Sequence, residues 1–204
     1  MILEFRTYTI QPRTLPEFLK RFGAGLGARE THSKLAAFWF TEIGPLNQVI
    51  HVWPYKDAGE RARIRAEAVK DGTWPPKVGD MIVDMKSEIM IPASFSPDLT
   101  AADIGPYFEM RSYVIKPGSA PEMAKRWAEY LPGRIALSPL VGVFTSDVGE
   151  LNQWVHIWAY KSLDQRMEVR NKAKADGIWP PPGDSPVIHQ ESKLMMAAPF
   201  SPIK

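Results

Sequence analysis

Residues 44–56 read GPLNQVIHVWPYK, and residues 149–161 read GELNQWVHIWAYK. The two segments lie 105 positions apart, and the same offset relates Phe95-Ser96-Pro97 to Phe200-Ser201-Pro202. A register that holds over most of the chain indicates a tandem duplication of one domain, because solenoid units are only about 20 to 50 residues long. We therefore expect two copies of a single domain.

The boundary between the copies is expected where the chain becomes polar and rich in Pro and Gly. Residues 98–105 have this composition, which is typical of a linker. The first repeat is therefore predicted to span residues 1–97 and the second residues 106–204.

Each repeat has the same predicted order of elements. Residues 2–10 alternate as a strand, and residues 15–22 have apolar positions at helical spacing. Two strands joined by a tight hairpin follow in residues 35–55, and then a helix over 57–70 and a strand over 84–91. The order βαββαβ is the ferredoxin-like motif.

Two helices cover only one face of such a sheet, so the other face needs a partner. The fold class is therefore predicted as α+β, with two ferredoxin-like repeats packed sheet to sheet around a chamber. In the third strand, Gln48, Ile50 and Val52 are assigned to the helix side. The chamber side is then expected to carry Asn47, His51, Trp53 and Tyr55, and in the second repeat Asn152, His156, Trp158 and Tyr160.

Composition excludes several classes of function. The 25 basic and 23 acidic residues are interspersed, so there is no basic stripe for nucleic acid. There is no cysteine, no basic leader and no apolar run near the roughly 20 residues that cross a bilayer. We expect a cytoplasmic protein without a transmembrane segment.

The string Gly-x-Leu-Asn-Gln-x-x-His-x-Trp-x-Tyr, with Phe-Ser-Pro after the fourth strand, resembles the NIPSNAP family and occurs twice. The resemblance implies the dimeric α+β barrel fold, with both halves supplied by one chain and a further homo-oligomer open. It transfers no catalytic residues, because the family has no agreed reaction. Eukaryotic relatives are linked to mitochondria, vesicle traffic and mitophagy signalling.

His51 and His156 occupy equivalent positions in the middle of a strand. A neutral imidazole there can act as an acid, a base or a ligand. It can equally be a buried, hydrogen-bonded structural group. No metal constellation stands out, although haem binding through one histidine or a two-histidine site between the copies stays open.

Glu4 and Arg6, like Glu109 and Arg111, lie two positions apart on one strand face, and we assign them to the chamber side with Tyr8 and Tyr113. They can form structural ion pairs. Alternatively, each arginine can receive a carboxylate or an enolate of a ligand.

The remaining aromatic and basic residues allow two interpretations. Trp53, Trp158, Tyr55 and Tyr160 can line a pocket for a flat apolar ligand or form barrel core. Trp74 and Trp179, in Pro-rich loops, are expected to plug an end of the barrel. The arginines of the second helix of each repeat are expected on a solvated face or lying over the core. They are Arg61, Arg65, Arg166 and Arg170.

The sequence thus predicts a protein of unassigned role that binds a small apolar or aromatic ligand in the barrel chamber. The alternatives are a cofactor-independent monooxygenase or isomerase, with His51 or His156 as base and Arg6 or Arg111 stabilising an oxyanion, and a protein-interaction module. An open polar pocket at either histidine favours ligand binding or catalysis. No cofactor is specified by the sequence.

Overall fold

Both halves of the chain form the predicted βαββαβ order in the computed structural model, which describes residues 1–72 and 74–204. The first repeat contains β1 (Ile2–Ile10), α1 (Leu15–Arg29), β2 (Ala37–Ile43), β3 (Gln48–Tyr55), α2 (Ala58–Lys70), η1 (Gly79–Met81) and β4 (Ile82–Pro92). The second contains β5 (Tyr107–Ile115), α3 (Ala120–Ile135), β6 (Leu140–Val148), β7 (Gln153–Tyr160), α4 (Leu163–Ala175) and β8 (Val187–Ala197).

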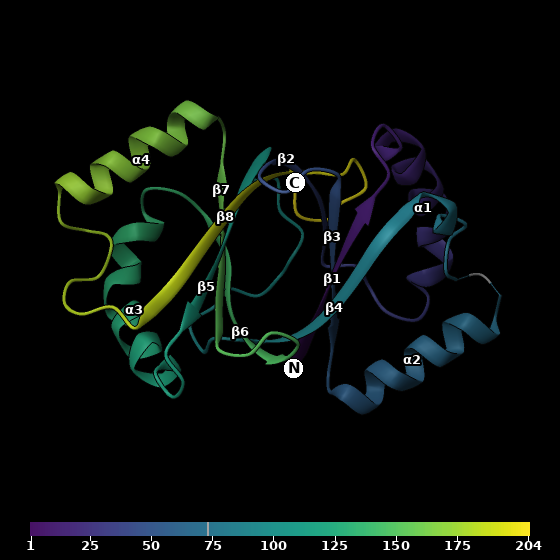
Figure 1. Cartoon of the computed structure of the whole chain (residues 1–204), viewed down its shortest axis with the longest axis horizontal. Coiled ribbons are helices and arrows are strands. Elements are labelled where there is room, and N and C mark those ends of the chain that lie inside the picture. Colours follow the sequence, from purple (N-terminus) through teal and green to yellow (C-terminus); the bar gives the residue numbers. More distant parts are fainter. Residues whose placement is uncertain (73) are drawn as a thin grey trace.

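The eight strands close into one antiparallel barrel in the order β1-β3-β2-β8-β5-β7-β6-β4. Strand β2 pairs with β8 and β4 pairs with β6, so each repeat completes the sheet of the other. The helices lie outside the barrel, α1 and α2 on the side of the first repeat and α3 and α4 on the opposite side (Figure 1). Closure leaves the sheet without free edges.

The hairpin motif Gly-x-Leu-Asn has a backbone explanation. Gly44 and Gly149 have φ of 112° and 121°, and Asn47 and Asn152 both have φ of 58°. Glycine and asparagine are the residues that tolerate this left-handed region. Asn47 and Asn152 were predicted as ligand-binding residues, but they shape the β2–β3 and β6–β7 turns and line neither cavity described below.

The core of the barrel is apolar and packed, which makes the predicted facing of the third strand wrong. Ile50 and Val52 point inward with Leu3 and Phe5, whereas Trp53 belongs to the layer under the helices. The interior of a small barrel is filled by side chains, so the aliphatic face turns inward. The polar and aromatic face therefore lies beneath the helices in both repeats. Most residues that were predicted to face the chamber therefore lie beneath the helices instead. They are Glu4, Arg6, Tyr8, His51, Trp53 and Tyr55 in the first repeat, and Glu109, Arg111, Tyr113, His156, Trp158 and Tyr160 in the second.

One end of the barrel is closed by residues 98–105 and the last residues of the chain. Ile203 joins the interior cluster, with Leu99 and Ile104 packed against it. Lys204 N–H donates to Ala102 O over 2.9 Å, which ties the two segments together. The plug is therefore formed by these segments.

The tryptophans expected as plugs lie elsewhere. Trp179 packs edge-on against Trp127 of α3 with ring centroids 4.6 Å apart, and Trp74 does the same with Phe22 of α1 at 5.1 Å. Both rings therefore belong to the layer between helices and sheet. Within the described residues, no helix is long and apolar enough to span a membrane.

Candidate functional site

A cavity of about 570 Å³ lies in the second repeat, between helices α3 and α4 and the outer face of the sheet. Five residues predicted as site residues line it: Arg111, Tyr113, His156, Trp158 and Tyr160. The sequence reasoning missed further lining groups because they belong to helices and loops that only the fold brings to the strand motif. The most prominent are Lys116, Arg126, Trp127, Arg134, Lys174 and Trp179.

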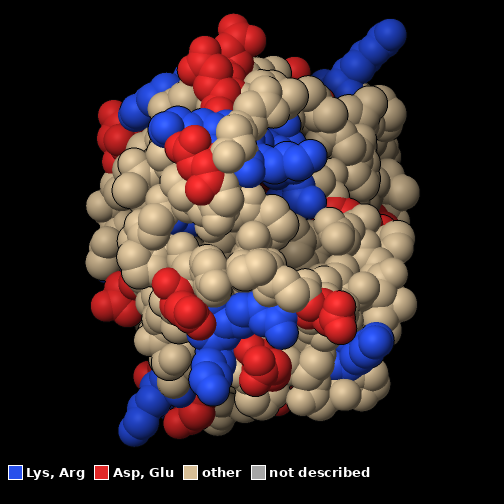
Figure 2. Space-filling model, turned by 90° about the vertical axis from the view of Figure 1, so that its left-hand side faces the viewer, with Lys and Arg blue, Asp and Glu red and all other residues tan. Residues whose placement is uncertain are grey.

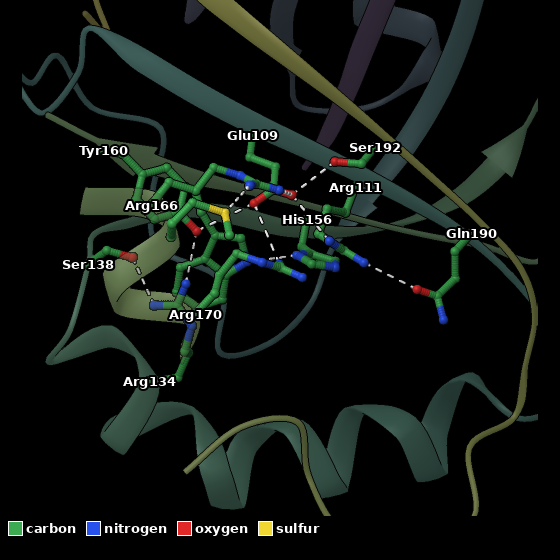
Figure 3. A network of polar contacts seen from close by, with 12 residues as sticks. Glu109, Arg111, Arg134, Ser138, His156, Tyr160, Arg166, Arg170, Gln190 and Ser192 are labelled. Carbon is green, nitrogen blue, oxygen red and sulfur yellow. Dashed lines mark hydrogen bonds and ion pairs between the residues drawn. The ribbon is translucent and has the colours of Figure 1, made fainter. Parts of the chain in front are cut away.

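Glu109 lies behind the cavity at the centre of a polar network (Figure 3). Its carboxylate is fully buried and lies 2.7 Å from Arg166, 3.1 Å from Arg111 and 3.8 Å from Arg170. Ser192 Oγ donates a further hydrogen bond over 2.9 Å. Burial alone would raise the pKa of Glu109, but the arginines outweigh it and lower that pKa to about 2.

Glu4 has the same surroundings in the first repeat. Arg61, Arg6 and Arg65 lie 2.6, 2.7 and 3.5 Å from its buried carboxylate. Burial raises the pKa of Glu4, and the arginines with Ser87 lower it to about 2. The prediction of a solvated helix face is therefore wrong for Arg61 and Arg166, which bind the buried carboxylates at 2.6 and 2.7 Å. Arg65 and Arg170 stay partly in water, with 38% and 40% of their side chains exposed, and lie farther from those carboxylates.

Each strand histidine accepts a hydrogen bond from the tryptophan two positions later. Trp158 Nε1 donates to His156 Nδ1 over 2.7 Å, and Trp53 Nε1 donates to His51 Nδ1 over 2.6 Å. An acceptor Nδ1 places the remaining proton on Nε2. In both histidines Nε2 is buried and has no hydrogen-bond partner among the described residues.

Both imidazoles are neutral at pH 7. Burial, reinforced by the charge of Arg111, lowers the pKa of His156 well below its usual value. Burial and the charge of Arg6 lower the pKa of His51 to about 3. His156 therefore presents a buried N–H donor beside the cavity rather than a titrating base.

Arg134 differs from the arginines around Glu109, because its hydrogen-bond partners are neutral. It is buried, and its guanidinium donates to Tyr160 Oη over 3.0 Å and to Ser138 Oγ over 2.8 Å. The same group lies 4.0 Å from the centre of the Trp158 ring. Over the ranges 1–72 and 74–204, no carboxylate lies within ion-pair distance of it. Burial lowers the pKa of Arg134 without removing its charge.

The two repeats differ in how this layer is filled. Where the second repeat has Met123 and Gly183, the first has the buried side chains Phe18 and Val78. The phenylalanine of the Phe-Ser-Pro segment packs on this layer in both repeats, Phe200 over Phe22 with ring centroids 5.9 Å apart and Phe95 against Trp154 at 6.4 Å. The repeated strand motif is thus covered by Phe18 and Val78 in the first repeat, whereas in the second the corresponding Met123 and Gly183 line the cavity.

The outer surface of the second repeat carries groups of basic side chains among scattered acidic ones (Figure 2). Six basic residues line the cavity, against the two carboxylates of Glu122 and Asp184. Arg126 donates to the backbone oxygen of Asp184 at the rim. The cavity is therefore electropositive.

The closed barrel of two ferredoxin-like repeats with external helices defines the dimeric α+β barrel class. Candidate monooxygenases from Lactobacillus acidophilus and Fusobacterium nucleatum share this fold, with TM-scores of 0.64 and 0.62. They cover 98% and 97% of this chain over 97% and 92% of their own lengths, at 10% and 12% identity.

The NIPSNAP family model matches residues 3–97 and 108–202, and the chain belongs to the NIPSNAP family. Human Protein NipSnap homolog 3A is 28% identical over 212 residues, which cover 98% of this chain and 85% of that protein. A Dictyostelium discoideum NipSnap homolog is 27% identical and covers 87% of this chain and 78% of its own length.

Proposed function

We propose that this NIPSNAP protein binds a small organic anion with an aromatic or apolar body in the cavity of the second repeat. The observation that carries the proposal is the composition of that cavity, in which basic groups converge between tryptophan rings. Pockets of this size hold small organic molecules, and a few placed polar groups orient them.

The charge of the ligand follows from the arginines. Arg111, Arg166 and Arg170 share one carboxylate, that of Glu109, so their positive charge exceeds the negative charge available to them. Among the residues that the structure describes, the hydrogen-bond partners of Arg134 are neutral. Arg134 is buried and Arg111 is largely so, and charges held away from water are costly unless they are compensated. A carboxylate or a similar anion therefore has a favourable place here.

The body of the ligand follows from the aromatic rings. Trp127, Trp158 and Trp179 line the same cavity, and Met123 adds an apolar wall. Flat aromatic ligands stack favourably on such rings. The ligand site thus lies outside the barrel wall, whereas the sequence had predicted it in the chamber between the sheets.

A second candidate function is catalysis on the bound anion. Arg111 and the unpartnered Nε2–H of His156 are two donors on one side of the cavity, and such donors stabilise a developing oxyanion. Because Nδ1 of His156 already accepts a hydrogen bond from the Trp158 N–H, this candidate assigns the histidine a donor role in place of the general-base role. Two such donors favour isomerase-type chemistry through an enolate over a purely scaffolding role for the barrel.

Calorimetric titration with 1-naphthylacetate tests anion binding, with 2-(1-naphthyl)ethanol as the uncharged control. We expect the anion to bind at least about 10-fold more tightly than the alcohol. Arg134→Met should abolish this preference. Arg29→Met, at the equivalent position of the first repeat, should leave it unchanged because Arg29 does not line the cavity.

Equal affinity for the anion and the alcohol would overturn the proposal. So would equal losses from Arg134→Met and Arg29→Met, because these two arginines make equivalent internal contacts with Tyr160 and Tyr55. Absence of saturable anion binding up to about 10 mM would have the same meaning.

A further inference from the structure

A second cavity, of about 500 Å³, lies inside the barrel at the end opposite the plug formed by residues 98–105 and Ile203. Its floor is apolar and includes Phe5, Met90 and Met110. The β2–β3 and β6–β7 turns border it through Pro45, Gly149 and Glu150. The space is a blind well on the inner face of the sheet, separated by the barrel wall from the cavity under α3 and α4.

The wall of the well carries neutral polar groups in matched positions. Thr7 and Ser112 are equivalent in the two repeats, as are Gln48 and Gln153, and all four are half-buried. Hydroxyl and amide groups both donate and accept hydrogen bonds. The well is thus polar on its sides, although the barrel core beneath it is apolar.

The charged residues of the well, in contrast, have opposite signs at equivalent positions of the two repeats. Glu88 of β4 corresponds to Lys193 of β8, and Lys86 corresponds to Glu191. In a symmetric pair of identical domains, like charges would occupy the two equivalent positions. The duplicated chain instead places a carboxylate and an ammonium group on opposite sides of one cavity.

Neither inner charge forms an ion pair within the described residues, although Glu191 and Glu88 attract Lys193, and Lys86 and Lys193 attract Glu88, from a greater distance. Lys193 Nζ donates to Gln48 Oε1 over 3.1 Å, and neither Lys193 nor Glu88 has an opposite charge within 4.0 Å in residues 1–72 and 74–204. Burial lowers the pKa of Lys193 and raises that of Glu88, which reflects the loss of water around both groups.

The turns hold both stems in place. A Cβ added to Gly149 would lie 2.9 Å from Cγ of Glu88, and one added to Gly44 would lie 3.2 Å from Cβ of Lys193. Two glycines of the family motif therefore allow the hairpin backbone to approach these charged residues closely. The turns therefore position the stems of both side chains, and the hydrogen bond to Gln48 Oε1 holds the ammonium group of Lys193.

We propose that the barrel well binds a small zwitterion, with its carboxylate toward Lys193 and its ammonium group toward Glu88. A zwitterion brings one opposite charge to each unpaired group and leaves the net charge of the well unchanged. A plain carboxylate or a plain amine would compensate only one of them. Thr7, Ser112 and Gln153 then provide hydrogen bonds to the same ligand.

Two-dimensional amide NMR of the full chain tests this proposal with a series of ω-amino acids from glycine to 6-aminohexanoate. We expect saturable shifts at Thr7, Gln48, Ser112 and Gln153, and one preferred chain length that matches the Glu88 to Lys193 separation. Propionate and propylamine, which carry one charge each, should bind at least about 10-fold more weakly.

Charge variants sharpen the test. Glu88→Lys should weaken the binding of the preferred amino acid by at least about 10-fold. The variant should prefer a dicarboxylate, since two ammonium groups then face each other across the well. The double variant Glu88→Lys, Lys193→Glu should retain amino-acid binding, because it restores one charge of each sign. Arg134→Met, in the outer cavity, should have no effect.

Shifts of equal size for the amino acid, propionate and propylamine would overturn the proposal, as would the absence of saturable shifts up to about 10 mM. Retention of amino-acid binding in Glu88→Lys would also overturn it. These outcomes do not depend on the outer cavity, which is monitored separately by 1-naphthylacetate binding.

Discussion

Ser201 Oγ accepts a hydrogen bond of 2.9 Å from the backbone N–H of Phe38, 163 positions earlier in the chain. Ser96 repeats this contact with Val143 N–H at 3.0 Å. The Phe-Ser-Pro segment of each repeat therefore docks on the second strand of the other repeat. This exchange gives the motif a structural role in joining the two halves.

Ser201→Ala should destabilise the fold by about 1 to 3 kcal/mol, because it leaves the buried N–H of Phe38 without an acceptor. Ser96→Ala should cost less, since Ser96 is half-buried and water can replace its hydroxyl. Urea unfolding of the two variants measures the difference. Equal effects would contradict the role of burial in this contact.

Residues 1–97 expressed alone should form a dimer or aggregate. In the full chain β2 pairs with β8 and β4 with β6, so the isolated repeat exposes two strand edges and the apolar inner face of its sheet. A homodimer can restore both pairings, because β4 is the counterpart of β8 and β2 that of β6. Light scattering coupled to size-exclusion chromatography should show this, and a stable monomer would contradict it.

Acid should destabilise the protein through Glu4 and Glu109. Both carboxyls have a folded pKa of about 2, below the ordinary value of 4.5, so their stabilisation is present above about pH 4.5 and is lost as the pH falls toward 2. The shift corresponds to about 3 kcal/mol per site. Glu109→Gln should flatten the pH dependence of the free energy of unfolding between pH 5 and about 2. An unchanged slope would contradict the contribution of Glu109 to acid destabilisation.

Arg6→Ala tests how the charge of Glu4 is shared. The pair considered in isolation predicts a loss of about 3 to 5 kcal/mol, the cost of stranding a buried carboxylate. Arg61 and Arg65 remain near Glu4 in this variant, so the structure lowers the expected loss to about 1 to 2 kcal/mol. Unfolding in urea distinguishes the values, and Arg6→Met with Glu4→Gln provides the uncharged reference.

His51→Ala and His156→Ala should destabilise the fold to a similar extent but differ in ligand binding. Each leaves a buried tryptophan N–H without its acceptor, which costs about 1 to 3 kcal/mol. Only His156 lines the cavity, so only His156→Ala should weaken 1-naphthylacetate binding. Calorimetry with both variants at matched stability checks this, and equal losses of affinity would indicate a purely structural role.

The order of the elements could be predicted from the sequence because its signals are local. Turn residues such as Gly44 and Asn47 and the cap at Asp57, whose Oδ1 accepts from Glu60 N–H over 2.9 Å, specify backbone geometry within a few residues. Each of these local signals also occurs a second time, 105 residues further along the chain. The pairing of the repeats followed because a half-covered sheet needs a second layer.

The site was only partly predictable. His156, Arg111 and Trp158 were identified as candidates by their strand positions, whereas Arg134 and Trp127 gave no signal. A buried arginine on an amphipathic helix looks the same in sequence as an exposed one. Its direction is set by packing against residues far along the chain, such as Tyr160.

The sequence by itself determined the duplication, the βαββαβ order and the strand residues that share a face. Only the tertiary structure decided which face of β3 turns inward. Residues 49–53 are all buried, so the alternation of Val49, Ile50, His51 and Val52 contains no contrast between water and core. Barrel closure settled the choice, since the interior must be filled by packed aliphatic groups while charged residues such as Glu4 find arginine partners under the helices.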